Sequence, residues 1–274
     1  MKTITLSQEK ILKALARYKY LTISLIDDLS IFKNKISIYR AIKPLKEGKK
    51  PLIIAHNFGV IPGKGQLESL LYLTKYGKEL LIDLGIDENK MKIPYSKTLV
   101  TTDYFHRVRT ISTFVYMDLY LKSTNNKMIF LDYYFDKGAD KGKKFKVAKN
   151  RIQLKDSFFI PDIVTKFIFN DKKYLYLIEI HNGVNTNKIY TQFLNHIIAI
   201  ENETPKQKYN HPRNNRVVII FEFESCMNAL IKKIQQEPKF KKFLKLFIFN
   251  TFDNIKLSFN EKWKDFNGDY CSFI

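Results

Sequence analysis

The first 85 residues carry apolar positions at helical spacing, followed by two strand-like segments. Ser7 is a candidate N-cap for a first helix, and Thr22 for a second short helix that ends near Leu29. A third helix is predicted from about Lys35, and Pro44 and Gly48 mark its end. The inward positions predicted for this third helix are Ile36, Ile38 (or Tyr39), Ile42 and Leu45.

The next segments predict a strand pair and one more helix. Residues 52–55 and 69–73 are strand-like, and the Gly-containing segment 56–66 between them is predicted to be a loop. Thr74 is placed to cap the helix that follows. Helix, helix, helix, strand, loop, strand, helix is the order of a winged helix-turn-helix, which predicts a DNA-binding domain over residues 1–88.

The rest of the chain has a different pattern. The polar stretch that contains Pro94 predicts a linker over residues 89–100. Beyond it, helical patterns alternate with strand-like runs, and a Lys-rich loop is predicted over 136–156. The predicted helices cover 103–122, 186–203 and 225–236, and the predicted strands cover 127–135, 157–169, 173–181, 216–223 and 243–249. This order indicates a mixed α/β sheet flanked by helices over residues 101–274, and an α+β chain overall.

The net charge of the chain predicts a negatively charged partner. There are 47 Lys and Arg against 27 Asp and Glu, so the net charge is +20. An AT-rich genome raises the number of lysines but does not explain the shortage of acids, so a polyanion such as double-stranded DNA is the better account. A membrane surface is the rival anion. No apolar run is long enough to span a bilayer, and the N-terminus turns polar at once, so we expect a cytoplasmic protein without a membrane partner.

The third predicted helix supplies the candidate DNA-reading residues. In a helix-turn-helix the N-terminal half of the second helix of the motif enters the major groove, where Arg and Lys pair with guanine and Asn with adenine. The candidates on this face are Lys33, Asn34, Lys35, Ser37, Tyr39, Arg40 and Lys43. His56, Asn57 and Lys64 are expected to touch the neighbouring backbone. In the Lys-rich loop, Lys143, Lys144 and Lys146 are expected to add a salt-sensitive contribution.

Two acidic residues in the second region are candidates for a metal-binding site. Asp162 follows Pro161 on one hydrophobic strand, and Glu179 lies near the end of the next strand among apolar residues. Acids so close to a core are costly unless they are paired or bind a cation. Because adjacent strands can bring both carboxylates to one ion, they form a candidate Mg²⁺ site.

This arrangement resembles the PD-(D/E)xK nuclease superfamily. Pro161-Asp162 and Glu179 match its pattern, whereas His181 occupies the position of the lysine. The resemblance implies catalytic roles for Asp162 and Glu179. His181 is then a candidate to orient water or act as a base, with Lys188 as the source of the missing positive charge. The alternative is that the domain keeps the fold and has lost cleavage.

The whole chain is similar to the plasmid replication-relaxation proteins, which join a winged helix to a nuclease-like domain. The similarity is carried by His106 and by four short segments: Tyr72-Leu-Thr-Lys-Tyr-Gly77, Pro161-Asp162, Glu179-Ile-His-Asn-Gly183 and Lys188-Ile-Tyr190. It implies DNA binding during plasmid replication initiation, relaxation or mobilisation. Other replication or transfer proteins and a second copy of the chain are then candidate partners.

Three functions stay open on the sequence alone. The first is a sequence-specific DNA-binding protein of a plasmid or mobile element. The second is a metal-dependent DNA endonuclease or nickase that uses the Asp162 and Glu179 carboxylates. The third is a non-catalytic winged-helix transcription regulator, whose second domain serves dimerisation or effector binding. The target sequence and the oligomeric state are not encoded in any of these patterns.

Overall fold

The computed structural model describes residues 3–94, 99, 101–138 and 146–274. The chain divides into two compact units, Met1–Val115 (unit 1) and Tyr116–Ile274 (unit 2), and the division falls inside one helix, α5 (Tyr104–Ser123). The linker predicted over 89–100 precedes this helix, and the predicted domain limits remain predictions. The chain as a whole is α+β.

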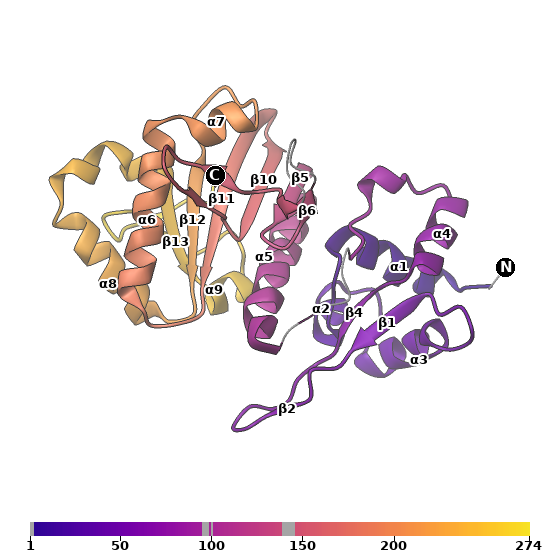
Figure 1. Cartoon of the computed structure of the whole chain (residues 1–274). Coiled ribbons are helices and arrows are strands. Elements are labelled where there is room, and N and C mark those ends of the chain that lie inside the picture. The colour runs from indigo at the N-terminus through magenta and orange to yellow at the C-terminus, as the bar shows by residue number, and fades with distance from the viewer. Residues whose placement is uncertain (1–2, 95–98, 100, 139–145) are drawn as a thin grey trace. The chain divides into compact units, whose positions relative to one another are not determined.

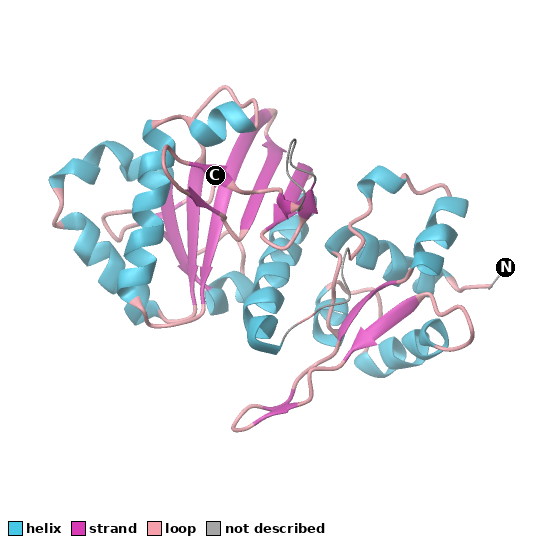
Figure 2. Ribbon diagram, viewed as in Figure 1, coloured by secondary structure: helices cyan, strands magenta, loops and turns pink. Residues whose placement is uncertain are grey.

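Before α5, the described residues of unit 1 form four α-helices and a strand pair in the order that the apolar pattern predicts (Figures 1 and 2). Its helices are α1 (Leu6–Tyr18), α2 (Ile23–Asp28), α3 (Lys35–Lys46) and α4 (Lys75–Asp83). Strands β1 (Ile53–His56) and β4 (Leu70–Leu73) pair antiparallel. A short 3-10 turn, η1 (Glu88–Lys90), follows α4, and another, η2 (Thr101–Asp103), precedes α5.

The helix starts of unit 1 follow from capping side chains. Thr22 and Thr74 are N-caps as predicted, because each hydroxyl accepts a hydrogen bond from the backbone three residues on. The prediction of Ser7 as the first N-cap is wrong, since Thr5 takes that place. Thr5 and Gln8 form a capping box, in which each side chain accepts a hydrogen bond from the backbone N–H of the other residue. These two hydrogen bonds favour a helix start at Thr5 over one at Ser7.

Helix α3 buries Ile38, Ile42 and Leu45, which lie along one stripe. The prediction that Ile36 faces inward is wrong, because its side chain is 63% exposed. Ile36 precedes Ile38 by two residues, about 200° around a helix, so the two side chains cannot share a face. The helix ends at Lys46, between Pro44 and Gly48, as predicted.

The predicted loop 56–66 contains a small hairpin. Its strands are β2 (Val60–Ile61) and β3 (Gly65–Gln66), which pair antiparallel. At the turn, the N–H of Lys64 donates to the carbonyl oxygen of Ile61 at 3.0 Å, and Gly63 has φ 75°. Pro62 followed by a residue with positive φ is the pattern of a type II turn, which explains why the segment folds back on itself.

Helix α4 packs closely against the start of β1. The hydroxyl of Thr74 donates to the carbonyl oxygen of Pro51 at 2.6 Å, and its N–H donates to the carbonyl oxygen of Leu52 at 3.0 Å. A Cβ atom on Gly77 would clash with this same Leu52 carbonyl. The segment 72–77 therefore has a structural role, because it locks the helix onto the strand pair.

Unit 2 is built on a seven-stranded sheet in the order β15-β14-β13-β12-β11-β10-β5. Strand β10 (Ile163–Phe169) pairs antiparallel with both β5 (Lys127–Tyr133) and β11 (Lys172–His181), whereas β12 (Arg216–Phe221) and β13 (Phe247–Thr251) run parallel to β11. Two short strands, β14 (Trp263–Lys264) and β15 (Tyr270–Cys271), follow β13 in this order, so β15 and β5 form the two edges of the sheet.

The segments between β5 and β10 form short strand pairs outside this sheet. They are β6 (Lys137–Gly138) with β7 (Val147–Ala148), and β8 (Ile152–Gln153) with β9 (Phe158–Phe159). The prediction of one continuous strand over 157–169 is wrong, because β9 and β10 are separate. Pro161 lies in the break, and a proline has no N–H to donate to a strand ladder.

Helices flank the sheet of unit 2 (Figure 2). Helices α6 (Thr186–Glu201) and α8 (Glu224–Gln235) pack over the face that carries Val217, Ile219 and Phe249. The opposite face, which carries Phe167 and Tyr176, contacts Phe273 near the C-terminus, and Tyr120 of α5 contacts Phe273 in turn. The remaining elements are α7 (Thr204–Lys208), the 3-10 segment η3 (Pro238–Leu246) and α9 (Phe252–Leu257). Within the described ranges, no helix is long and apolar enough to cross a membrane.

Candidate functional site

The exposed side of α3 is a stripe of apolar and basic side chains. Ile36, Tyr39, Arg40 and Lys43 follow one another at the i, i+3, i+4, i+7 spacing of one helix face, and all four are exposed. Lys33 and Lys35 are exposed at the start of the helix. We call this exposed side of the helix the α3 face. From Lys33 to Lys46 the chain contains no Asp or Glu, so every charged side chain of this segment is positive.

Some of the predicted DNA-reading residues already have partners within unit 1. The Oδ1 of Asn34 caps α3, accepting from the N–H of Ser37 at 2.9 Å and from its hydroxyl at 3.1 Å. The Nζ of Lys35 donates to the Ser24 hydroxyl at 3.3 Å. In contrast, no ion pair joins Lys33, Arg40 or Lys43 to another residue in the part of the chain that the structure describes. Their charge is therefore not neutralised by any residue that the structure describes.

The residues of loop 56–66 that are predicted to contact DNA also have partners within unit 1. The His56 ring lies 4.6 Å from that of Phe58, and the Oδ1 of Asn57 accepts from Gly59 at 2.9 Å and from Gln66 at 3.1 Å. The Nζ of Lys64 lies 4.2 Å from the ring centroid of Phe105. These contacts shape the hairpin, and DNA contact from it stays a prediction. In the Lys-rich loop, Lys146 is exposed, while Lys143 and Lys144 lie outside the described residues.

A tight turn in unit 2 brings the two predicted carboxylates together. Asn170 and Asp171 have φ 45° and 60°, as in the type I′ turn that favours a two-residue hairpin loop. This turn fixes the register in which Ile163 pairs with Ile178. One step further along, Asp162 therefore lies opposite Glu179, and directly opposed residues share a sheet face. The Oδ2 of Asp162 accepts from the N–H of Ile180 at 2.7 Å.

Glu179 is almost fully buried, with 1% of the residue exposed. Its Oε1 lies 2.7 Å from the Nε2 of His196, and its Oε2 has no hydrogen-bond partner among the described residues. Burial, together with the negative charge of Asp162, raises the pKa of Glu179 well above its usual value. A hydrogen-bonding contribution from the backbone of Asp162 and the positive charge of Lys188 act in the opposite direction and lower the pKa of Glu179.

His196 is a member of this cluster that the sequence reasoning missed. It lies on α6 and is fully buried, and its ring packs 4.7 Å from that of Phe159. Burial, reinforced by the nearby His181, lowers the pKa of His196 to about 3. A signal was present in the sequence, because His196 falls on the helix stripe of Ile189, Phe193 and Ile200. A polar residue at a core position needs a buried partner.

The structure brings His181 near the cluster and leaves Lys188 at its rim. His181 is buried two residues beyond Glu179 on β11, and so on the same sheet face, with its ring 5.4 Å from that of Phe221. Lys188 is exposed in the first turn of α6. Asp162, Glu179, His181 and His196 thus form one group, the acidic-histidine cluster, and Lys188 reaches it only through its charge.

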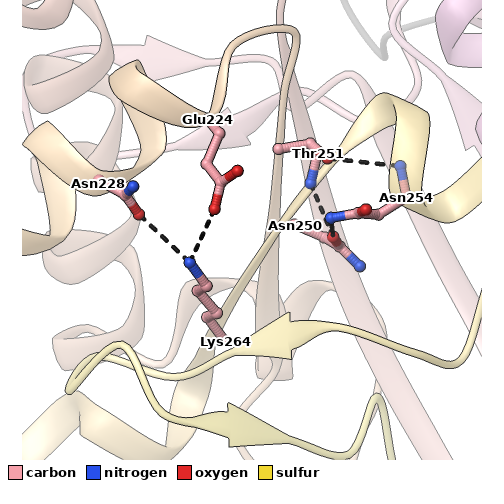
Figure 3. A network of polar contacts seen from close by, with 6 residues as sticks. All are labelled: Glu224, Asn228, Asn250, Thr251, Asn254 and Lys264. Atoms are coloured by element: carbon pink, nitrogen blue, oxygen red, sulfur yellow. Dashed lines mark hydrogen bonds and ion pairs between the residues drawn. The ribbon is translucent and has the colours of Figure 1, made fainter.

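A second polar network lies where β12 and β13 lead into the helices that follow them (Figure 3). The Nζ of Lys264 donates to the Oε1 of Glu224 at 3.0 Å, and to Asn228 at 3.5 Å. The Oδ1 of Asn250 accepts from the N–H of Thr251 at 2.8 Å and from the Asn254 side chain at 3.1 Å. These polar side chains are paired with one another. We therefore assign them a structural role, which is to hold the strand-to-helix connections of unit 2.

The donor set of the acidic-histidine cluster limits the kind of metal site that it can form. No group of three or more His, Cys, Asp or Glu side chains is arranged to hold a metal among the described residues. Mg²⁺, however, is commonly held by one or two carboxylates together with water and phosphate oxygens. The partnerless Oε2 of Glu179 beside Asp162 fits that two-carboxylate mode, and it does not fit a metal held by protein side chains alone.

Comparisons of the chain with known protein families, with characterised proteins and with solved structures gave no match.

Proposed function

We propose that this chain is a sequence-specific DNA-binding protein of a plasmid or mobile element. In this proposal unit 1 is a winged helix-turn-helix, α3 lies in the major groove, and the β2–β3 hairpin is the wing. The observation that carries the proposal is the α3 face, where Arg40 and Lys43 lie on one exposed stripe and form no ion pair with any described residue. A surface of this kind suits the phosphates and base edges of a duplex.

The distribution of charge supports two DNA-facing regions. Residues 1–85 hold 15 Lys and Arg against 7 Asp and Glu, and the remainder holds 32 against 20. Both parts are strongly basic, so we infer that unit 2 also contacts nucleic acid. The resemblance to plasmid replication-relaxation proteins is the reason for proposing a role in replication initiation, relaxation or mobilisation.

Selection of bound duplexes from a random pool tests this function. We expect a selected duplex to bind about 10³-fold or more tightly than a scrambled one at physiological salt. Arg40→Ala should weaken binding to the selected duplex. Lys10→Ala is the matched control, because Lys10 is an exposed lysine on α1 of the same unit and should leave binding unchanged. Equal affinity of the wild-type chain for selected and scrambled duplexes would contradict the proposal.

A second candidate function is metal-dependent cleavage or nicking of DNA by unit 2. It is favoured by the opposed Asp162 and Glu179, because the buried Oε2 of Glu179 has no hydrogen-bond partner among the described residues. The element order α5, β5, β10, β11, α6, β12 also supports a PD-(D/E)xK-like core. Asp162 and Glu179 would hold Mg²⁺, which supplies stabilisation of phosphate charge when bound.

The residues of this chain have separable roles in that candidate. The Nε2 of His196 fixes one oxygen of Glu179, so that the other oxygen stays on the Asp162 side. The N–H of Ile180 fixes Asp162. His181 stands where the superfamily has lysine, and a neutral imidazole can accept a proton from water near neutral pH.

Supercoiled DNA incubated with Mg²⁺ or Mn²⁺ tests this second candidate. Nicking that is lost in both Asp162→Ala and Glu179→Gln, while both variants keep duplex affinity, would support it. Intact DNA with either metal, under conditions in which the wild-type chain binds the duplex, would exclude cleavage. Neither result bears on the DNA binding proposed for unit 1.

A further inference from the structure

The α3 face combines apolar and cationic side chains in an unusual way. Ile36 is 63% exposed and Tyr39 is 59% exposed, and both lie on the stripe of Arg40 and Lys43. A single exposed isoleucine is ordinary on a protein surface. Here, however, two large apolar side chains lie side by side within a segment that carries only positive charge. The partner of this surface must therefore offer negative charge and an apolar group together.

The duplex major groove offers both. Phosphates line its edges, and the C5-methyl group of thymine is the one apolar group that a base pair presents there. An acidic protein surface could pair with the cations, but it would have to bring its own apolar patch to cover Ile36. Since the whole segment from Lys33 to Lys46 is free of acids, the complementary charge is that of a continuous polyanion.

Hydrogen bonds within α3 remove one alternative way of reading an A·T pair. A two-bond contact from Asn to adenine needs both the oxygen and the nitrogen of the amide. The Oδ1 of Asn34 is already occupied by the N–H and the hydroxyl of Ser37. Asn34 can then offer only its Nδ2 donor, so the two-bond contact to adenine is lost and Ile36 is the side chain placed to contact a thymine methyl group.

We propose that Ile36, with Tyr39 beside it, reads the methyl groups of thymines in the bound duplex. The inference rests on the proposed DNA-binding function and adds the base that this face prefers. Ile36 supplies apolar contact, Arg40 supplies hydrogen bonds to a neighbouring base or phosphate, and Lys33 and Lys43 supply charge. The target is accordingly a duplex with thymine opposite the first turns of α3.

Replacement of thymine by uracil tests this directly, because it removes the methyl group and nothing else. In a selected duplex, each thymine is exchanged for uracil in turn and the dissociation constant is measured. At one or two positions, uracil should weaken binding of the wild-type chain about fourfold, which corresponds to the free energy of burying one methyl group. Ile36→Ala should bind the thymine and uracil duplexes equally, while Lys10→Ala should keep the fourfold difference.

The outcomes separate this inference from the function on which it rests. Selective binding by the wild-type chain with no effect of uracil at any position overturns methyl reading and leaves the DNA-binding function standing. If Ile36→Ala binds both duplexes more weakly and keeps the fourfold preference for thymine over uracil, methyl reading by Ile36 is also overturned and Ile36 makes another contact. Equal binding to selected and scrambled duplexes overturns the DNA-binding function itself. Ile36→Ala should keep the wild-type thermal midpoint, because the side chain is exposed.

Discussion

Charged side chains have opposite surroundings in the two units. On the α3 face of unit 1, Arg40 and Lys43 are exposed and have no ion pair within the part of the chain that the structure describes, so their charges stay hydrated. In unit 2, Glu179 is buried against His196, and its burial raises its pKa. An exposed charge costs the fold little, whereas a buried one costs stability unless something binds it. On this comparison rests our proposal of a different ionic partner for each region, an anion for unit 1 and a cation for unit 2.

The largest expected effect separates two neighbouring isoleucines of α3. Ile38→Ala should lower the free energy of unfolding by about 2–5 kcal/mol, because Ile38 is fully buried. Ile36→Ala should change it by less than about 0.5 kcal/mol, since Ile36 lies on the surface. Urea unfolding of both variants measures the difference. Similar losses for both would mean that the α3 face is part of the core.

Next in size is the loss of DNA affinity when the α3 face is neutralised. The triple variant Lys33→Ala, Arg40→Ala, Lys43→Ala should bind its selected duplex about 100-fold more weakly, because charge and base contacts are lost together. The matched control removes the same charge at Lys10, Lys75 and Lys90, which are exposed elsewhere in unit 1. Equal losses in the two triple variants would assign the effect to net charge and not to α3.

In unit 2 the raised pKa of Glu179 makes stability depend on pH. A carboxyl with a raised folded-state pKa stabilises the fold below its unfolded pKa, and that stability is lost as the pH rises through the folded-state pKa. Glu179→Gln, which stays neutral, should therefore exceed the wild-type free energy of unfolding at pH 8 by about 1–3 kcal/mol. The gain should shrink towards pH 5.

The control for that comparison is Glu79→Gln, because Glu79 is exposed on α4. It should show no such pH-dependent gain. If Glu179→Gln is less stable than the wild type at pH 8 as well as at pH 5, the native cluster relies on an ionised carboxylate and our account of its cost is wrong.

The smallest expected effect is a cation-dependent shift of the thermal midpoint. A metal ion must displace the proton that the raised pKa keeps on Glu179, so binding should strengthen as the pH rises. Saturating Mn²⁺ should raise the thermal midpoint by a few degrees more at pH 8 than at pH 6, by mass action on the folded state. Loss of this shift in both Asp162→Ala and Glu179→Gln would show that the ion binds at these two carboxylates. An unchanged shift in the variants would mean that the ion binds at another site.

Local patterns predicted much of the fold. The helix starts at Thr22 and Thr74 and the order of elements in unit 1 follow from capping and periodicity, which act over a few residues. The position of Ile36 was missed because Ile36 and Ile38 are both apolar, and only one of them can join a stripe with Ile42 and Leu45. The short elements that follow Thr251 carry too few residues for a periodic signal.

The candidate sites were predicted in part. Asp162 and Glu179 were identified from their apolar surroundings, and the turn at Asn170 and Asp171 held the register that sets them opposite each other. His196 could not be paired with Glu179 from the sequence, because the packing of α6 on the sheet is a long-range contact. The internal hydrogen bonds of Asn34 likewise emerge only once α3 has its cap.

The dependence of DNA affinity on salt tests the central claim most directly. The logarithm of the association constant is measured against the logarithm of salt concentration for the wild-type chain and for the two triple variants. Each lost phosphate contact lowers the magnitude of the slope by about 0.9. We predict a decrease of about 2–3 for the variant of Lys33, Arg40 and Lys43, and none for the variant of Lys10, Lys75 and Lys90. Equal slopes for all three proteins would contradict the assignment of DNA binding to the α3 face.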